Sequence, residues 1–434
     1  MNQKPASHSA WLLLGFLTLL NILNFVDRQL IVNLAKPLAD DLGLSLTNVA
    51  WLYGYIFLVF YTLMGMVMAT LADRLSRQRL IAGGLLLWSL LTAASGAAGS
   101  FLHLALARML VGIGEATLTP AALSILGDAF PPKRRALASG IYYSGVSLGS
   151  GLSLIIVGWV ASSYGWRNCF YVLGVLGLAL VPIVLLVKTP PRGAAETGIK
   201  TNLATEPQLT TREIYRVLFQ TLRRSPALML TIAAAVLINF STSAGSYAFT
   251  WLVRERGMNF RTTGILMGVI VMIAGLLGSS VISYLSDWFH QRFSGGRLWL
   301  LFFKAFFLAP FIVGYYTLAI DAPYRLFYVC WFMATLHSLS WYGPIFATVQ
   351  DLAPLKIRAT AIAFLMLVIN IIGTGLGPLV AGMIGDRYSL WRGLMVCAAI
   401  GYISIIPLFL AARRYKTDLD RTPEAALAAA PTMV

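Results

Sequence analysis

The stretch from His103 to Gly127 reads HLALARMLVGIGEATLTPAALSILG, an apolar run that holds two charged residues, Arg108 and Glu115. At a rise of about 1.5 Å per residue, a helix of this length crosses a hydrocarbon core of about 30 Å. A charged side chain is costly at that depth unless it faces a bundle interior or a watery cavity, so such residues mark substrate, ion or proton pathways. The stretch therefore predicts a membrane-spanning helix that carries part of the functional site.

Apolar runs of similar length recur through most of the 434 residues, of which 58% are hydrophobic and 12% charged. Soluble domains carry about 25% charged residues, so this composition is typical of an integral membrane protein. The runs are too long for the strands of a membrane barrel, which need about ten alternating residues. We therefore predict an all-α membrane protein with twelve transmembrane helices, at 11–35, 49–72, 80–101, 103–127, 136–160, 168–188, 226–252, 261–285, 297–319, 324–350, 357–384 and 390–412.

The net charge of +16 reflects membrane topology and not nucleic-acid binding. When the loops are assigned alternately to the two sides, most of the 33 Lys and Arg residues fall on the side that carries both termini. By the positive-inside rule that side is cytoplasmic. We expect a multi-pass protein of the cell membrane, a bacterial inner membrane, with both termini in the cytoplasm. The three cysteines all lie in predicted spans, and their spacing fits neither a disulfide framework nor a zinc site.

A polar, basic segment separates the first six predicted spans from the last six. Pro190 and Pro191 end the preceding helix, and apolar residues return at Pro226. Within this segment, residues 210–213 fit a capping box at the start of an amphipathic helix, which we expect on the cytoplasmic surface. The predicted domains are an N-terminal six-helix bundle (1–188), a cytoplasmic linker with the amphipathic helix (189–225), a C-terminal six-helix bundle (226–413) and a cytoplasmic tail (414–434).

The two halves resemble each other at a nearly constant offset, which apolar composition alone does not explain. A parallel repeat of two six-helix halves is a transporter architecture, with substrate bound near the bilayer midplane. The matched residues are Asn24 with Asn239, Phe25 with Phe240, Asp73 with Asp287, Pro120 with Pro344, Gly149 with Gly373, Gly158 with Gly382, and Trp166-Arg167 with Trp391-Arg392. In this alignment Asp27 corresponds to Thr242 and Glu115 to Leu339, so the second half lacks both carboxylates.

Asp27, Arg108 and Glu115 form the predicted proton-coupling group. Asp27 and Arg108 lie at similar depths in their helices, which permits an ion pair. Glu115 lies near the bilayer centre, where the flexible side chain of Arg108 could reach it. Desolvation disfavours the charged form of a carboxylate whereas a nearby arginine favours it, and this competition makes a switchable proton site. The alternative is that Arg108 only neutralises Asp27 and stabilises the first half.

The seventh and tenth spans offer neutral and aromatic side chains that suit an amphiphile with few charges. Together with Arg108 and Glu115, the predicted substrate-binding residues are Asn239, Thr242, Tyr247, His337, Trp341 and Tyr342. Ordinary aromatic packing between helices is the alternative for each of them. Arg28 points about 100° away from Asp27 around the helix, so we expect it to snorkel or to form a structural pair. We expect Lys304 to snorkel to the cytoplasm.

The stretch ATLADRLSRQR, residues 69–79, resembles the helix 2–3 loop signature of the major facilitator superfamily, G-x-x-x-D-R-x-G-R-K. Asp73, Arg74 and Arg77 match the signature. Two glycines and one basic residue are replaced, by Ala69, Ser76 and Gln78. Within the superfamily, NFVDR (24–28) and ARMLVGIGEAT (107–117) are similar to the spinster group.

This resemblance implies a proton-coupled secondary active transporter that works by alternating access. The spinster group suggests a lysophospholipid or sphingosine-phosphate-like lipid, whose phosphate Arg108 would hold. In the superfamily the helix 2–3 loop stabilises the state closed to the cytoplasm. The expected gating residues are therefore Asp73, Arg74 and Arg77, with Asp287 added by the repeat.

Other functions remain open at this point. One is proton-coupled transport of small organic anions or drugs; another, of a different class, is an uncoupled lipid scramblase or a transporter-like sensor. The sequence contains no ATP-binding loop and no catalytic or metal-ligand spacing, so we expect neither an enzyme nor a cofactor. The expected partners are a small amphipathic substrate, protons and membrane lipids, with no nucleic acid and with the protein as a monomer.

Overall fold

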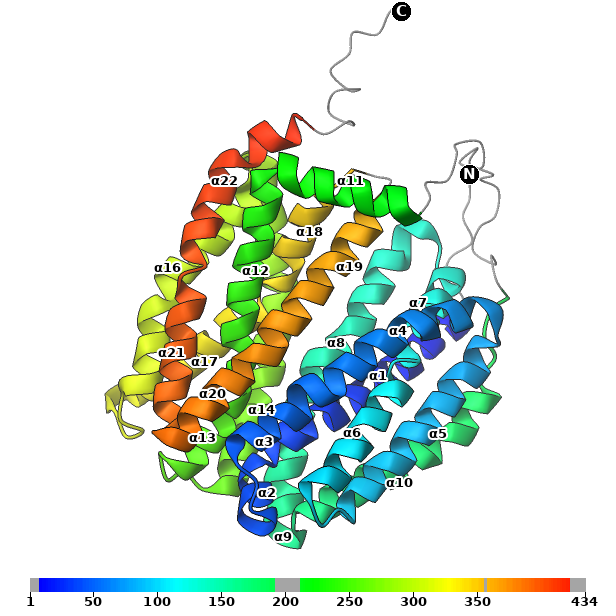
Figure 1. Cartoon of the computed structure of the whole chain (residues 1–434), viewed down its shortest axis with the longest axis vertical. Coiled ribbons are helices and arrows are strands. Elements are labelled where there is room, and N and C mark those ends of the chain that lie inside the picture. Colours follow the sequence, from blue (N-terminus) through cyan, green and yellow to red (C-terminus); the bar gives the residue numbers. More distant parts are fainter. Residues whose placement is uncertain (1–7, 192–210, 355–356, 422–434) are drawn as a thin grey trace, which may run out of the picture. The chain divides into compact units, whose positions relative to one another are not determined.

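The computed structural model describes residues 8–191, 211–354 and 357–421, and every regular element in this part of the chain is helical (Figure 1). The first elements are α1 (His8–Asn33), α2 (Ala35–Leu42), α3 (Leu46–Trp51), η1 (Leu52–Ile56), α4 (Phe57–Arg74), α5 (Arg77–Gly96), α6 (Phe101–Glu115), α7 (Leu118–Ala129), α8 (Pro132–Ile156), η2 (Val157–Ala161), α9 (Ser162–Tyr164) and α10 (Trp166–Leu186). The remaining elements are α11 (Thr211–Arg224), α12 (Pro226–Ala244), η4 (Gly245–Tyr247), α13 (Ala248–Arg254), α14 (Phe260–Leu277), η5 (Gly278–Ile282), α15 (Ser283–Arg292), α16 (Gly296–Thr317), η6 (Pro323–Arg325), α17 (Leu326–Leu339), α18 (Tyr342–Leu352), α19 (Arg358–Val368), η8 (Ile369–Gly375), α20 (Leu376–Arg387), α21 (Leu390–Tyr402) and α22 (Ile405–Leu419).

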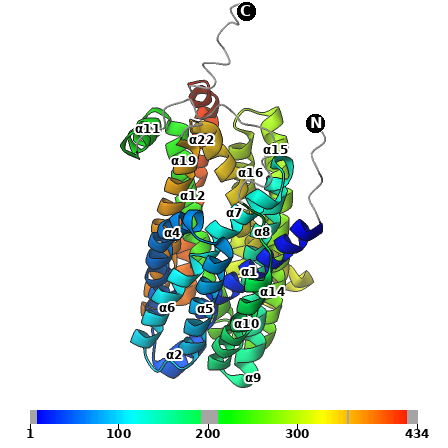
Figure 2. The ribbon, with the colours of Figure 1, turned by 90° about the vertical axis from the view of Figure 1, so that its right-hand side faces the viewer.

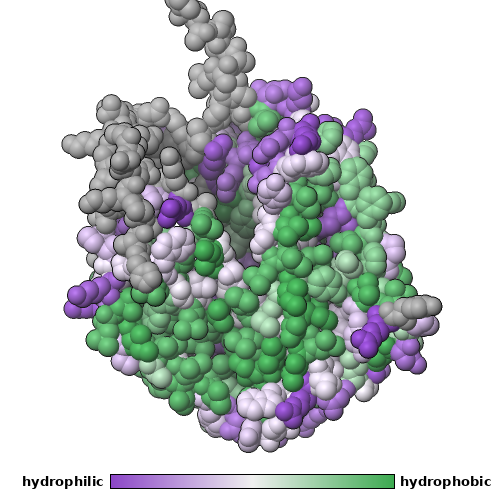
Figure 3. All heavy atoms as spheres, turned by 180° about the vertical axis from the view of Figure 1, so that it is seen from behind, coloured by the Kyte–Doolittle hydropathy of each residue, from purple (hydrophilic) through white to green (hydrophobic). Residues whose placement is uncertain are grey.

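Eleven helical segments of the described chain are long and apolar enough to cross a membrane. On the face seen in Figure 3, hydrophobic side chains occupy the middle and hydrophilic ones gather toward both ends. The segment absent from the eleven is the predicted span at 324–350, which is divided into α17 and α18. The predicted span at 324–350 is therefore present as two helices, with a break between Leu339 and Tyr342. Counted as a single broken helix, α17 and α18 complete a twelve-helix fold.

Proline explains why the tenth span breaks, and why the fourth span breaks at the matching place. A proline inside a helix removes one hydrogen bond and its ring clashes with the carbonyl group four residues earlier. Pro344 stands four residues after Ser340, where α17 has ended, and Pro120 stands four residues after Ala116, where α6 has ended. The two halves of the repeat therefore share a helix break at the same position, with the same cause.

The amphipathic helix predicted in the linker is confirmed as α11, although position 210 of its predicted capping box lies outside the described residues. Its apolar side is buried at Leu218 and Leu222, while Tyr215 and Phe219 are exposed. Figures 1 and 2 show α11 lying across the end of α12 and beside α19, and it contacts both helices.

The described residues group into two compact units. The first unit comprises the described residues of Met1–Thr201, Ser246–Met272 and Gly382–Leu390, and the second comprises those of Asn202–Gly245, Ile273–Ala381 and Trp391–Val434. In the first unit, α5 runs beside α10 in both views, and α1 packs along α8 (Figures 1 and 2). The first unit therefore includes two segments from the second half of the sequence. The prediction of domains divided at 188 and 226 stays a prediction.

The carboxylate of Asp386, near the end of α20, links the segment Gly382–Leu390 to the start of α3. Asp386 accepts hydrogen bonds from the backbone N–H of Leu46 (2.8 Å) and from Thr47, through its N–H (2.9 Å) and its hydroxyl (2.6 Å). The hydroxyl of Tyr247 donates to the carbonyl oxygen of Leu46 at 2.5 Å. Gly382 allows this approach, because a Cβ there would lie 3.0 Å from the same carbonyl oxygen. We name Asp386, Leu46, Thr47 and Tyr247 the Asp386 junction.

A second carboxylate is held by one of the repeated residue pairs. Asp41 accepts hydrogen bonds from Arg167 at 2.5 Å and from the indole of Trp166 at 3.0 Å. These bonds, with that from Arg167 first, hold the pKa of Asp41 below its ordinary value. Asp41 therefore stays charged where the end of α2 meets the start of α10.

We expect Asp386→Ala to destabilise the protein by about 1–3 kcal/mol, because it leaves backbone donors of α3 without their acceptor. Thermal unfolding of the full chain in detergent measures the loss. Thr47→Val removes one of the same bonds, so the double variant should lose less than the sum of the single variants.

Asp321 provides the matched control, because it is an exposed acid in the loop before η6. Asp321→Ala should leave the melting temperature unchanged. An Asp386→Ala protein as stable as the wild type, or additive effects with Thr47→Val, would contradict the junction.

Candidate functional site

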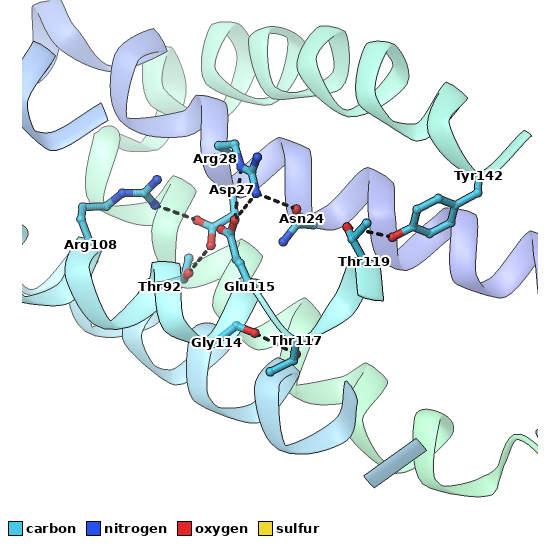
Figure 4. Close-up of polar contacts among 10 residues, drawn as sticks. All are labelled: Asn24, Asp27, Arg28, Thr92, Arg108, Gly114, Glu115, Thr117, Thr119 and Tyr142. Carbon is cyan, nitrogen blue, oxygen red and sulfur yellow. Dashed lines mark hydrogen bonds and ion pairs between the residues drawn. The ribbon is translucent and has the colours of Figure 1, made fainter. Parts of the chain in front are cut away.

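Four charged side chains meet inside the first unit (Figure 4). Asp27 and Arg28 come from α1, and Arg108 and Glu115 come from α6. Asp27, Arg108 and Glu115 are only 1–2% exposed. The close approach of α6 depends on small residues, because a Cβ at Gly114 would lie 2.9 Å from the Cβ of Trp88 on α5. The site thus holds two acids and two arginines among tightly packed helices.

Asp27 is held from two sides. Its Oδ2 atom accepts a hydrogen bond of 2.6 Å from the hydroxyl of Thr92 on α5. Its Oδ1 atom lies 3.8 Å from Nη1 of Arg108, close enough for an ion pair but too far for a hydrogen bond. The Arg108 guanidinium also lies over the ring of Phe57, with 4.8 Å to the centroid. Asp27 and Arg108, which the sequence placed at similar depth, thus lie side by side.

Glu115 is bound by Arg28 and not by Arg108. Its Oε2 atom accepts hydrogen bonds from Nε (3.3 Å) and Nη2 (3.2 Å) of Arg28. Sequence reasoning named Arg108 as the cation for Glu115, and the structure corrects this. The rotation of about 100° between Asp27 and Arg28 does not separate their charges, because the long arginine side chain reaches around the helix. The sequence feature that could have indicated this pair is the position of Arg28 next to an acid on an otherwise apolar helix.

Arg28 occupies an aromatic cage. Its guanidinium carbon lies 4.7 Å from the ring centroid of Phe25, 5.0 Å from that of Phe57 and 4.2 Å from that of Tyr61. Such cation–π contacts favour arginine in a desolvated site. The Arg28 side chain is 17% exposed, against 1% for that of Arg108. Arg28 is therefore the more accessible of the two cations.

Each acid in this cluster keeps one oxygen that has no hydrogen-bond partner among the described residues. These atoms are Oδ1 of Asp27 and Oε1 of Glu115, and Nε and Nη2 of Arg108 are likewise without an acceptor. A proton can therefore be accepted at either acid without first displacing its present hydrogen-bond donor. This arrangement suits reversible protonation.

The predicted substrate-binding residues of the second half form two groups. In the second unit, Asn239 donates to the hydroxyl of Tyr342 at 3.3 Å, and Trp341 stacks on Tyr342 with 3.9 Å between centroids. Thr242 bonds the carbonyl oxygen of Asn239 on its own helix. Tyr247 belongs instead to the first unit, where the Asp386 junction uses its hydroxyl.

His337 and Lys304 meet at the break in the tenth span. The amine of Lys304 donates to the carbonyl oxygen of His337 at 3.1 Å and to the hydroxyl of Ser340 at 2.8 Å. The expectation that Lys304 snorkels to the cytoplasm is therefore wrong. The freed backbone groups at the break hold the amine inside the unit.

The predicted gating residues show a repeated ion pair. The side chains of Asp73 and Arg74 lie outside the described residues. Arg77 at the start of α5 binds Asp128 near the end of α7, and also donates to the hydroxyl of Ser124 at 3.0 Å.

In the second unit, Arg297 at the start of α16 binds Asp351 near the end of α18, and binds Asp287 at 2.8 Å. Sequence reasoning missed Asp128 and Asp351 because they follow long apolar runs and match no motif. Among the described residues, no cluster of three or more His, Cys, Asp or Glu side chains could hold a metal ion.

Comparison with known proteins identifies the family. The sequence matches the Major Facilitator Superfamily over residues 17–372. The chain belongs to the Major Facilitator Superfamily. Its members are transporters, so this chain is a multi-pass membrane transporter and not an enzyme.

Two relatives within the superfamily are of particular interest. An MFS-type efflux pump of Mycolicibacterium smegmatis is 32% identical over 425 residues, covering 94% of each chain. Protein spinster of Drosophila melanogaster is 26% identical over 392 residues, 88% of this chain, and the match spans 63% of the length of that relative.

A solved superfamily structure has the same fold. It is a bacterial homologue of the human lysosomal transporter spinster, in an inward-facing and unoccupied conformation. The TM-score is 0.82 at 24% identity, covering 95% of this chain and 98% of that one. The superfamily fold and the spinster resemblance expected from the sequence are confirmed.

Removing one member of the Asp27–Arg108 pair should destabilise the protein by roughly 3–5 kcal/mol, because the other charge is left buried and alone. We expect Asp27→Asn or Arg108→Met to lower the melting temperature strongly. The double variant should recover most of the loss. Thermal unfolding of the purified full chain measures all three.

The exposed pair Lys36–Asp40, at 2.6 Å, provides the control. Asp40→Asn should change stability by less than about 1 kcal/mol. A double variant as unstable as the worse single variant would show that the two charges do not compensate each other.

Proposed function

We propose that this transporter couples substrate movement to protons, with Asp27 and Glu115 as the proton-carrying groups. The observation that carries the proposal is the balance of two acids against two arginines in a nearly dry site. Protonation of Glu115 removes the counter-charge of Arg28, and protonation of Asp27 removes that of Arg108. A buried charge without a partner costs several kcal/mol, so each protonation favours a rearrangement that supplies another anion or water.

This charge balance supports an anionic substrate. A proton on Glu115 and an anionic head group on Arg28 together restore neutrality, so the two ligands favour each other's binding. Arg28 suits this role better than Arg108, because it is partly exposed and its aromatic cage can also contact an apolar tail. We infer a lysophospholipid or sphingosine-phosphate-like amphiphile, in line with the similarity to protein spinster.

A second candidate follows from the M. smegmatis relative, which is named an efflux pump. In that case the substrate is a small organic anion or a drug, and the same acids exchange protons for it. Uptake into proteoliposomes with and without a pH gradient, across lysolipids, organic acids and cationic drugs, separates the two candidates. Flux that no proton gradient changes would favour a scramblase instead.

The Arg77–Asp128 and Arg297–Asp351 pairs support a gating role at the end of the bundle that the charge pattern predicts to be cytoplasmic. Each pair joins the start of one membrane span to the end of the following span. Loss of the pair therefore changes how these two ends pack. We further propose that both termini are cytoplasmic, that the membrane is the bacterial inner membrane, and that the transporter works as a monomer by alternating access.

We expect Glu115→Gln to reduce gradient-driven accumulation about tenfold or more while exchange of substrate across the membrane continues. The amide keeps the size and a hydrogen-bond acceptor for Arg28 but cannot titrate. Proteoliposome uptake under an imposed pH gradient, compared with counterflow without a gradient, measures the two activities separately. Unchanged pH-dependent uptake would exclude Glu115 from coupling.

Asp321→Asn is the control, because it neutralises an exposed acid far along the chain from the cluster. It should leave both accumulation and exchange at the level of the wild type.

A further inference from the structure

The break in the tenth span gathers polar groups around a single amine. The last turn of α17 leaves carbonyl groups without helical partners, as every helix end does. Lys304 of the neighbouring α16 donates to the carbonyl oxygen of His337 and to the hydroxyl of Ser340, at 3.1 and 2.8 Å. On another side, Gly278 of η5 approaches so closely that a Cβ there would lie 3.0 Å from the Cβ of Ser340. Residues of α16 and η5 therefore both approach Ser340, just after the end of α17.

Lys304 has no carboxylate within ion-pair distance among the described residues. Leu298, Leu301 and Ala305, on the buried side of α16, are apolar, and the acids of this part of the chain lie at the helix ends, where Arg297 binds Asp287 and Asp351. The contacts of the amine are a neutral carbonyl and a neutral hydroxyl. These satisfy two of its three donors but supply no negative charge. An ammonium group in such surroundings is stabilised by an anion.

The break in the fourth span, in the first unit, corresponds to this break and also carries a charged group. There the last residue of α6 is Glu115, and a cation from the first span binds it. In the second unit the corresponding residue is Leu339, and a cation is present without an acid. The repeat therefore places an ionic group at both breaks, with its anionic partner built in only at the first.

Two ring nitrogens on residues of the break also have no partner in the described part of the chain. The indole Nε1 of Trp341 and Nδ1 of His337 are buried and have no hydrogen-bond partner among the described residues. The Trp341 side chain is fully buried, and its indole nitrogen can only donate. Lys304 and His337 are both partly buried, whereas Ser340 and Trp341 are buried.

We propose that the amine of Lys304, at the break between α17 and α18, binds the carboxylate or phosphate group of the transported molecule. The inference rests on the proposed function in taking an anionic substrate, and it adds a second ionic site in the other half of the repeat. The anion replaces the carbonyl and hydroxyl contacts of the amine with a charge-assisted bond. A lysolipid head group and a small organic anion share this chemistry.

Equilibrium binding to the full chain in detergent, without any pH gradient, tests the site. The probes are lysophosphatidylglycerol as an anionic lysolipid, lysophosphatidylcholine as a lysolipid of no net charge, and glucuronate as a small carboxylate. Lys304→Gln keeps an N–H donor for His337 and Ser340 but removes the charge, whereas Lys304→Arg keeps the charge. For the anionic probe that the wild type binds, Lys304→Gln should lower the affinity by about tenfold or more. Lys304→Arg should retain most of that affinity.

Two further variants keep the result interpretable. Ser340→Ala removes one contact of the amine and should leave anion binding equal or stronger, so it tests the site even if Lys304→Gln fails to fold. Lys36→Gln, at an exposed lysine, should change nothing. Lysophosphatidylcholine should bind all variants alike.

The outcomes separate this site from the proposed function. Wild-type affinity for the anionic probes in Lys304→Gln, or loss of binding in Ser340→Ala, would overturn the Lys304 site while leaving the Glu115 result untouched. A wild-type protein that binds neither anionic probe would overturn the anionic substrate itself, and the Lys304 site with it. Binding of lysophosphatidylglycerol alone identifies a lipid substrate, and binding of glucuronate alone identifies a small organic anion.

Discussion

Charge neutrality among buried side chains is the constraint on which the candidate site depends. Asp27 faces Arg108 and Glu115 faces Arg28, and three of these four side chains are almost completely buried. An unpaired buried charge is energetically unfavourable. Protonation of either acid therefore favours a conformational change or the binding of another ligand. Under the proposed function, the same constraint that holds the first unit together also makes it respond to protons. Stability and proposed mechanism share one cause.

The repeat keeps the scaffold and changes the chemistry. Prolines at matching positions break the fourth and tenth spans, and arginines at matching helix starts bind acids at matching helix ends. At the breaks themselves the halves differ, with a carboxylate bound by arginine in one and an amine bound by a carbonyl group in the other. The proposed proton site and the proposed anion site are thus two versions of one structural position. A transporter that moves an anion with a proton can use both.

The sequence was sufficient for the parts of the fold that depend on length, composition and periodicity. It predicted the membrane helices, the repeat, the superfamily and the amphipathic helix α11. It did not predict the Arg28–Glu115 pair, because the partner of a side chain depends on where two helices cross, and helical periodicity gives only the direction of each residue. The break in the tenth span was readable from Pro344, but apolar residues around it suggested a continuous helix. The contacts of Lys304 follow from that break, so they were missed with it.

The central claim is that protons act on conformation through Asp27 and Glu115. The most direct test is the distance between spin labels at two exposed positions, Arg79 in the first turn of α5 and Ser294 in the turn before α16, since the three native cysteines are buried. Acidification should shift the distance distribution of the wild type. A one-unit change in proton affinity at each acid supplies about 1.4 kcal/mol, so the two together can move a balanced equilibrium roughly a hundredfold. The account predicts that Asp27→Asn with Glu115→Gln abolishes this shift, and a double variant that still responds with the wild-type midpoint would contradict it.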